Sequence, residues 1–279
     1  RIENVLIMKN RLNTYSLPMT HPTDTAHKPQ HTESQQLWFS FVEGDTYTQP
    51  DPFFFDLSNT TWIAELEQNW TTIKQELSVL LAEQDTGIIP YINRTLANQA
   101  TNWTVFVLFA WGITLRRNCR KCPVTTQLLQ KIPNMVSASF SMMRPQTSIK
   151  PHLGDTNAMY RCHLGLQIPA GTPQCTMKVG NEERPWHEGK VLAFCDAQRH
   201  TAWNKTDQPR YVLIFDVIRP QFAHQTPWIC AKVLGNLFWQ TLFQKFYIIG
   251  HFPPFVRRMM MNITQYPARL AMWLYGRLS

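Results

Sequence analysis

Apolar residues follow a helical period between residues 59 and 84. In NTTWIAELEQNWTTIKQELSVLLAEQ, large apolar side chains recur at intervals of three and four, at Trp62, Leu66, Trp70, Ile73, Leu77 and Leu80. This spacing predicts an amphipathic helix, and the polar residues at 58–60 can cap its start. The apolar run over 103–115 fits a strand or a buried helix, because periodicity does not separate the two at this length. A short helix is expected after Pro123.

From Val136 onward the apolar residues alternate with a period of two. The segments VSASFSMM, RCHLGLQI, CTMKV, KVLAF and RYVLIFDVI are short, and Pro, Gly or Asn-Glu turns separate them. Several short strands at such intervals predict a small antiparallel sandwich or barrel. The first 36 residues are rich in Thr, Pro, His and Gln and have no sustained period, so they predict a tail.

These patterns divide the chain into four predicted parts and indicate an α+β fold. The parts are a flexible N-terminal tail (1–36), a helical segment (37–134), a β core (135–222) and a helical C-terminal extension (223–279). At 279 residues with 44% hydrophobic side chains, the chain can bury a full core, and one principal domain is the expectation.

The net charge of +8 is spread unevenly. From residue 221 to the end there are six Lys and Arg residues and no Asp or Glu, in a segment that is also rich in Trp, Phe, Tyr and Met. Cations and aromatic rings together suit an anionic membrane surface. A C-terminal pair of helices packed on the core with a basic outer face explains the same composition, and the two interpretations are compatible. We expect no nucleic-acid partner.

Composition also limits targeting and cysteine chemistry. No segment reaches the ~20 uninterrupted apolar residues of a spanning helix, and no signal-peptide pattern is evident. We therefore expect a cytoplasmic protein that is peripheral to a membrane if its C-terminal segment binds lipid. Six cysteines in a chain of this length do not make a disulfide scaffold. Cys119 and Cys122 have no second pair, so a structural zinc site is not expected.

Charged and imidazole side chains gather in the predicted β core. Arg161 and His163 are two apart on one strand and therefore share a face. Inside a barrel, a buried cation needs an anionic partner. His200 ends one predicted strand region and Arg210 starts the next. Any one of these residues alone has an ordinary structural explanation, but together they suit a metal that binds a dicarboxylate.

The segments PHLGDTNAMYRCHLGLQIP, VGNEERPWHEGKVLAFCDAQRHTAWN and PRYVLIFDVIRP resemble the aspartyl/asparaginyl beta-hydroxylase family of Fe(II)- and 2-oxoglutarate-dependent dioxygenases. The resemblance implies a double-stranded β-helix core of the jelly-roll, cupin-like kind, and hydroxylation of a C–H bond with O₂. It implies that His152 and His200 are the iron ligands and the catalytic pair. It also implies a 2-oxoglutarate pocket in which Arg210 and Ser141 hold the distal carboxylate. Arg161 and His163 would hold the carboxylate nearer the iron.

The resemblance departs from a two-histidine, one-carboxylate iron site at one position. Gly154 stands two residues after His152, and Asp155 follows one place late, on the opposite face of a strand. The glycine predicts an open coordination position that water, or a halide in a halogenase, would fill. A dry shell around the metal is expected from Phe194, from Trp203 and from the strand residues at 164 and 166.

The substrate is the least determined part of the prediction. Peptidyl-aspartate hydroxylases resemble this chain except that an arginine for the substrate carboxylate lies where this chain has Met159. A peptidyl Asp or Asn, an acyl chain of a lipid and an amino-acid-like molecule therefore all stay open, so the partner is a protein, peptide or lipid. A membrane-associated acyl-chain hydroxylase of the lipid A type is one alternative. A barrel without catalysis that serves as a binding module is the other.

Overall fold

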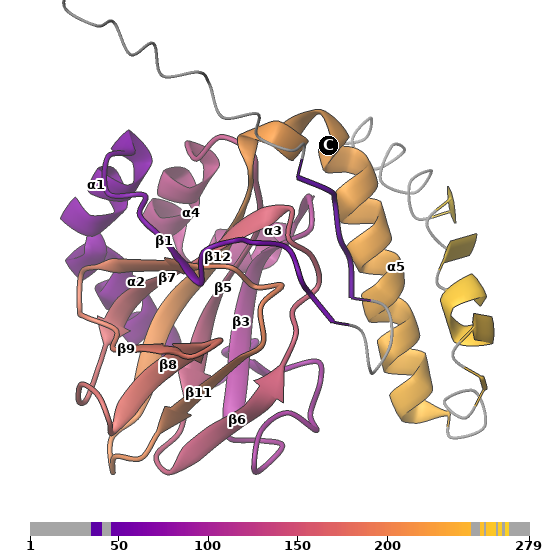
Figure 1. Ribbon diagram of the computed structural model, residues 1–279. Coiled ribbons are helices and arrows are strands. Elements are labelled where there is room, and N and C mark those ends of the chain that lie inside the picture. The colour runs from indigo at the N-terminus through magenta and orange to yellow at the C-terminus, as the bar shows by residue number, and fades with distance from the viewer. Residues whose placement is uncertain are drawn as a thin grey trace, which may run out of the picture. The chain divides into compact units, whose positions relative to one another are not determined.

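The structure is a computed structural model of the chain, and the described residues begin at Gln35 (Figure 1). They are 35–40, 46–246, 252–253, 255–260, 262–263 and 266–267. The predicted tail over 1–36 lies almost wholly outside these residues. The predicted C-terminal extension over 223–279 is described in part.

Two antiparallel sheets form the core, as Figure 1 shows. The larger sheet has the strand order β1-β10-β7-β12-β5-β3-β2, with β4 paired to β3. Its strands are β1 (Phe54–Phe55), β2 (Ile89–Pro90), β3 (Trp103–Ala110), β4 (Ile113–Thr114), β5 (Met135–Met143), β7 (Met159–Gln167), β10 (Val191–Phe194) and β12 (Arg210–Ile218). The smaller sheet has the order β6-β11-β8-β9. Its strands are β6 (Thr147–His152), β8 (Cys175–Val179), β9 (Glu182–Arg184) and β11 (His200–Asn204).

The inner faces of the two sheets pack on each other. One apolar cluster joins Trp103, Met143 and Val212 of the larger sheet to Ile149 and Met177 of the smaller one. Two facing antiparallel sheets with side chains interdigitating between them are the arrangement of a jelly roll. The predicted double-stranded β-helix is therefore confirmed, and the apolar run over 103–115 is mainly a strand.

Helices cover the outer face of the larger sheet. They are α1 (Thr61–Gln68), α2 (Trp70–Ala82), α3 (Arg116–Cys119) and α4 (Pro123–Gln130). The single helix expected over 59–84 is interrupted at Asn69, whose side-chain amide donates to the Glu65 carbonyl at 2.8 Å. Asn favours such local bonds over a regular helix, because its side chain competes with the backbone. The apolar stripe still faces the sheet, since Leu66, Ile73 and Leu77 are all buried.

Alternation along β7 decides which side chains enter the barrel. Cys162 and Leu164 belong to the cluster under the helices. Arg161 and His163, on the other parity, face between the sheets, as a period of two requires. The prediction that these two side chains share a face is confirmed, and that face lies in the interior of the barrel.

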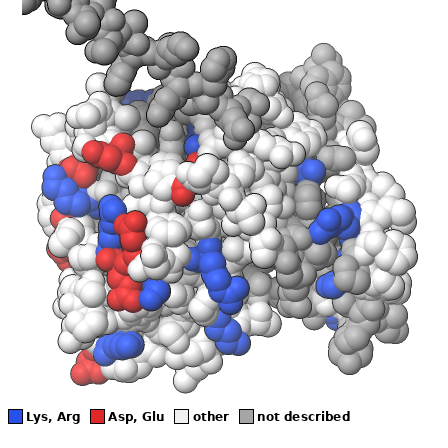
Figure 2. Space-filling view, in the orientation of Figure 1, with Lys and Arg blue, Asp and Glu red and all other residues white. Residues whose placement is uncertain are grey.

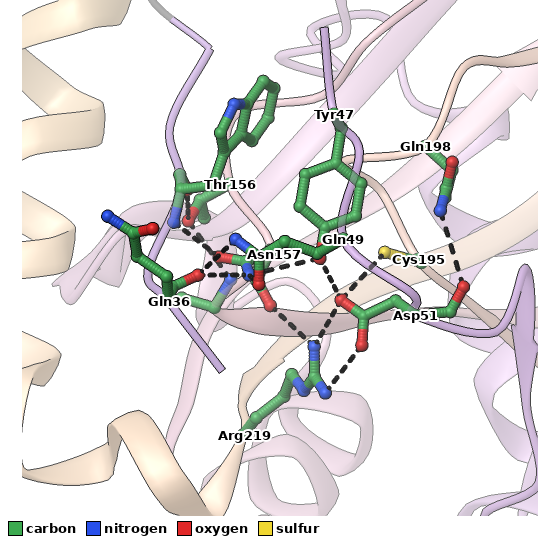
Figure 3. Close-up of polar contacts among 11 residues, drawn as sticks. Gln36, Tyr47, Gln49, Asp51, Thr156, Asn157, Cys195, Gln198 and Arg219 are labelled. Carbon is green, nitrogen blue, oxygen red and sulfur yellow. Dashed lines mark hydrogen bonds and ion pairs between the residues drawn. The ribbon is translucent and has the colours of Figure 1, made fainter. Parts of the chain in front are cut away.

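A buried polar network ties the first described segment to the barrel (Figure 3). Arg219 donates from both terminal nitrogens to the Asp51 carboxylate, each at 3.0 Å, and also to the Asn157 carbonyl at 3.1 Å. The Asn157 side chain accepts from the Trp38 amide at 2.8 Å and donates to the Gln36 carbonyl at 3.0 Å. Because all these donors and acceptors satisfy one another, the segment can lie against the barrel without stranding a buried polar group.

After β12 the chain forms η1 (Pro220–Gln225) and α5 (Thr226–Lys245). The first half of α5 packs through Ile229 and Val233 on Met159 and Ile218 at the ends of β7 and β12. Within the described residues, no helix is both long enough and apolar enough to span a membrane. All six cysteines are buried and unpaired, which agrees with the absence of a disulfide scaffold.

Candidate functional site

His152 and His200 lie side by side at the ends of two paired strands. His152 is the last residue of β6, His200 is the first of β11, and the antiparallel register places them opposite each other. Their ring centroids are 4.2 Å apart. The two residues are 48 positions apart along the chain and were predicted to share one site, and the structure brings them together.

Both rings are held in the same tautomer. The Nδ1 atom of His152 lies 2.9 Å from the Lys150 carbonyl, and that of His200 lies 2.8 Å from the Gln198 carbonyl. A carbonyl only accepts, so each Nδ1 carries the proton and each Nε2 presents a lone pair. Burial lowers the pKa of His152 to about 3 and that of His200 to about 4, which keeps both rings neutral. Neutral imidazoles oriented by a carbonyl are suitable metal ligands.

These pKa shifts predict that the metal-free protein loses stability in mild acid. The unfolded rings titrate near 6.5, whereas the folded rings stay neutral to about pH 3 and 4. Below pH 6.5 the unfolded state therefore binds more protons. The free energy of unfolding should fall by about 1–2 kcal/mol per ring between about pH 7 and pH 5. Urea unfolding at both pH values measures this loss.

The matched control replaces both rings by glutamine, which cannot titrate. The double variant should show a shallower pH dependence than the parent, and an equal slope would contradict the assignment. Asp155 works in the opposite direction, because burial and Asp196 raise its pKa to about 7 and favour its protonated folded form below that pH. The variant Asp155→Asn separates this contribution.

His163 presents a buried donor without a protein acceptor. The indole of Trp186 donates from Nε1 to His163 Nδ1 at 3.1 Å. Because Nδ1 accepts, the ring proton is on Nε2, and this buried atom has no hydrogen-bond partner among the described residues. A buried N–H without an acceptor costs free energy, so it indicates an acceptor that binds there.

Arg210 is also a buried donor without a hydrogen-bond partner among the described residues, and unlike His163 it carries a full positive charge. Its side chain is buried, and its Nε and Nη1 atoms have no hydrogen-bond partner within the described residues. The guanidinium lies 4.7 Å from the centroid of the Trp186 ring. Burial lowers its pKa to about 10, and the cation persists at neutral pH. Each of these unpaired nitrogens can donate a charge-assisted hydrogen bond to an anionic oxygen.

Ser141 lies beside this pair of donors on the neighbouring strand. It faces Val212 across β5 and β12, two residues along from Arg210. Its hydroxyl oxygen accepts from the Trp103 indole at 3.0 Å, which leaves the hydroxyl proton to donate elsewhere. The three predicted carboxylate-binding residues Ser141, His163 and Arg210 thus come from three adjacent strands of the larger sheet.

Arg161, the fourth residue predicted to hold 2-oxoglutarate, contacts protein carboxylates. Its Nε and Nη2 donate to Asp216 at 2.8 and 3.0 Å, and its Nη1 donates to Asp196 at 2.6 Å. These carboxylates raise the pKa of Arg161 above its usual range, although burial opposes them. Binding of a co-substrate carboxylate by Arg161 stays a prediction, and the observed contacts give it a role in orienting Asp196.

Asp196 fills the space beside Gly154. A β-carbon at position 154 would overlap the Asp196 carboxylate, and the Gly154 amide donates to the Asp196 carbonyl at 2.8 Å. Asp196 Oδ1 lies 3.6 Å from His200 Nε2. A carboxylate from the loop before β11 thus occupies the space next to the glycine where a side chain at 154 would begin, and the open coordination position stays a prediction.

This close approach makes Gly154→Ala a strongly disruptive change. The added methyl group must displace the buried Asp196 carboxylate and disturb its bond to Arg161. We expect a loss of roughly 1–3 kcal/mol in the free energy of unfolding, together with lower activity. Thermal unfolding and metal titration measure the two effects.

Exchanging the partners provides the control. In the double variant Gly154→Asp/Asp196→Gly the carboxylate comes from β6 instead of the loop, so it should recover part of the metal affinity that Asp196→Gly loses. If Gly154→Ala unfolds at the parent temperature, Asp196 does not depend on the glycine.

Of the side chains expected to form a dry shell, only Phe194 lies against the histidines. The Phe194 ring lies 5.5 Å from His200 and 5.0 Å from His163, centroid to centroid. Leu164 and Leu166 instead point outward under the helices, and Trp203 donates to a carbonyl away from the interior. Both errors follow from strand parity. Trp186 was missed, because it lies in an irregular segment without periodicity.

The donor atoms of the histidine pair suit a metal. Within the described part of the chain, no set of three or more His, Cys, Asp or Glu side chains forms a complete metal site by itself. The two Nε2 lone pairs fit a metal that takes two ligands from the protein and its other ligands from small molecules. Asp196 places a negative charge beside them.

The fold and this site define a double-stranded β-helix protein whose interior holds paired imidazoles and buried hydrogen-bond donors that have no acceptor among the described residues. Residues 67–220 match the aspartyl/asparaginyl beta-hydroxylase family, and the chain belongs to that family. The predicted family membership and the predicted fold class are thereby confirmed.

Curated relatives fall into two groups by name. An ornithine lipid ester-linked acyl 2-hydroxylase of Rhizobium tropici is 35% identical over 173 residues, which are 61% of this chain and 62% of that protein. Human aspartate beta-hydroxylase domain-containing protein 2 is 33% identical over 194 residues, and the match covers 63% of this chain and 52% of that protein. Human aspartyl/asparaginyl beta-hydroxylase is 32% identical over 171 residues, and the match covers 60% of this chain and 22% of that protein. The matches thus span less than two thirds of each relative.

Proposed function

We propose that the protein is an Fe(II)- and 2-oxoglutarate-dependent dioxygenase that hydroxylates an unactivated C–H bond. The observation that carries this proposal is the set of buried donors without acceptors, His163 Nε2 and two nitrogens of Arg210, in the barrel that also holds the neutral histidine pair. A dicarboxylate satisfies both features, because one end can pair with the cation while the other reaches the metal.

Each residue has a distinct part in this proposal. His152 and His200 hold the metal through Nε2. Arg210 and Ser141 bind the distal carboxylate of 2-oxoglutarate. His163 donates a hydrogen bond to the part of the co-substrate that lies nearer the metal. Arg161 fixes Asp196 beside the histidines through a 2.6 Å ion pair, so we give it a positioning role in addition to its predicted contact with the co-substrate.

Bound Fe(II), with O₂ and 2-oxoglutarate, supplies the oxidant that inserts one oxygen atom into a C–H bond while 2-oxoglutarate becomes succinate and CO₂. The chain contributes the geometry and the exclusion of water. Phe194 lies against both His163 and His200, and Trp186 covers the guanidinium of Arg210. A dry pocket strengthens the ion pair with the co-substrate.

For the substrate we propose a lipid-linked acyl chain. Met159, at the position where peptidyl-aspartate hydroxylases have a carboxylate-binding arginine by resemblance, is fully buried in an apolar cluster with Ile218 and Val233. No cation therefore reaches the site from that position. The name of the Rhizobium tropici relative, an acyl 2-hydroxylase, supports the same class. A peptidyl Asp or Asn is the second candidate, supported by the names of the human relatives.

The test supplies purified protein with Fe(II), ascorbate and 2-oxoglutarate and measures succinate. Acyl lipids and an Asp-containing peptide are offered in parallel, and mass spectrometry looks for the gain of one oxygen atom. Succinate formation coupled to lipid oxidation supports the full proposal, and oxidation of the peptide alone corrects the substrate. No succinate and no metal binding would favour a binding module instead. A cytoplasmic location remains part of the proposal and is tested by cell fractionation.

A further inference from the structure

The C-terminal segment exposes apolar side chains in short helical stretches. Residues 255–260, 262–263 and 266–267 are helical. Phe255 and Met259 are four residues apart in the first of these stretches and therefore lie on one side of it, and Ile263 and Tyr266 belong to the next two. They are 73%, 55%, 59% and 71% exposed. We call these four residues the C-terminal stripe. A helix of a globular protein normally turns such a stripe toward the core.

Aromatic rings are also exposed in the second half of α5 and directly after it. Phe238 and Phe246 are 55% and 47% exposed. Trp239 stacks on Phe243 with ring centroids 5.6 Å apart. The first half of α5 is anchored through Ile229 and its neighbours on the barrel, so the exposed rings belong to an element whose other end is fixed to the core.

The charges around these rings have one sign. Lys232, Lys245, Arg257 and Arg258 lie in this part of the chain, which has no acidic residue after Asp216. Figure 2 shows acidic and basic residues mixed on the left of the view, whereas on the right, where α5 lies, the charged residues that are coloured are all basic. Cations beside exposed aromatic rings are complementary to anionic lipid headgroups above an acyl interior.

We propose that the C-terminal stripe, with Phe238 of α5 and Phe246 directly after that helix, docks the protein on an anionic bilayer surface. The rings enter the headgroup region, and Lys245 and Arg258 meet lipid phosphates. The stripe would account for exposed apolar side chains that the barrel does not cover. This docking needs neither metal nor co-substrate and is therefore independent of the proposed catalysis.

The experiment measures sedimentation of the purified full chain with phosphatidylcholine vesicles, with and without phosphatidylglycerol. We expect binding to the anionic vesicles, weakening as NaCl is raised, because salt screens exposed charges. The variant Phe255→Ser/Met259→Ser/Ile263→Ser should bind at least tenfold more weakly. The variant Lys245→Gln/Arg258→Gln should lose the difference between anionic and neutral vesicles.

Matched controls change the same kinds of residue elsewhere. Val79→Ser/Leu81→Ser/Ile89→Ser removes three exposed apolar side chains from α2 and β2, and Arg120→Gln/Arg144→Gln removes two exposed cations. Both should bind as the parent does, and circular dichroism verifies that every variant is folded. Unchanged binding of the stripe variant overturns the proposal. So does a dimer in light scattering that the stripe variant loses while no vesicle binding occurs, since the stripe would then join two copies.

Discussion

Replacing His200 by alanine should abolish hydroxylation and lower metal affinity by at least ~100-fold, since even residues that only support a ligand cost 10- to 100-fold. Among the described residues the ring is one of two imidazoles that present a lone pair to the site, and its orientation is set by the Gln198 carbonyl at 2.8 Å. Fe(II) or Mn(II) affinity by equilibrium dialysis and succinate formation measure the two effects. His152→Ala should behave in the same way.

The control for this prediction is His187→Ala, which removes an exposed histidine on the segment next to Trp186. It should leave metal affinity and turnover at the parent level. His200→Gln separates ligation from packing, because it fills similar volume without an imidazole. Near-normal metal affinity in a folded His200→Gln variant would remove this residue from the metal site.

Replacing Arg210 by methionine should raise the KM for 2-oxoglutarate about 100-fold or more. A charge-assisted hydrogen bond contributes ~1.5–3 kcal/mol, and two are lost. The same change should leave the co-substrate-free protein equally or more stable, because it removes a buried guanidinium that has two nitrogens without partners. Co-substrate kinetics and thermal unfolding without 2-oxoglutarate test the two parts. Arg210→Lys keeps the charge but not the bidentate geometry, so it should give an intermediate KM.

Arg219→Met is the matched control for stability. Arg219 is also buried, but it pairs with the Asp51 carboxylate through two 3.0 Å contacts. Its loss strands a buried carboxylate, which typically costs 3–5 kcal/mol. A clear loss of stability in Arg210→Met, comparable to that in Arg219→Met, would mean that Arg210 is structural and not poised for a ligand.

Local patterns in the sequence predicted most of the strands and helices of the fold. The period of two from Val136 predicted the strands, and the spacing of three and four after Trp62 predicted the helices on the sheet. These predictions succeed because each strand or helix must bury one face, and burial of one face produces a periodic pattern of apolar residues. The break at Asn69 escaped the prediction, since the apolar spacing continues unchanged across it.

Part of the site was also accessible to sequence reasoning. Arg161 and His163 share a strand face by parity alone, and His152, His200 and Arg210 follow the spacing of a known family. Asp196 was not accessible. It is 42 residues from Gly154 along the chain, in a loop, and only the tertiary structure shows that its carboxylate fills the place of the missing side chain. Trp186, which orients His163 and covers Arg210, could not be predicted either, because it lies in an irregular segment and contacts residues that are distant in the sequence.

The sequence by itself determined the parity of the strands, the faces of the helices, the family and the uneven charge of the C-terminal segment. Each of these depends on residues that are close together or on composition. The tertiary structure decided which carboxylate stands beside the histidines, which donors lack acceptors and which aromatic rings stay exposed. Those features depend on contacts between distant residues in irregular segments, where hydrogen bonding and packing leave no period in the sequence.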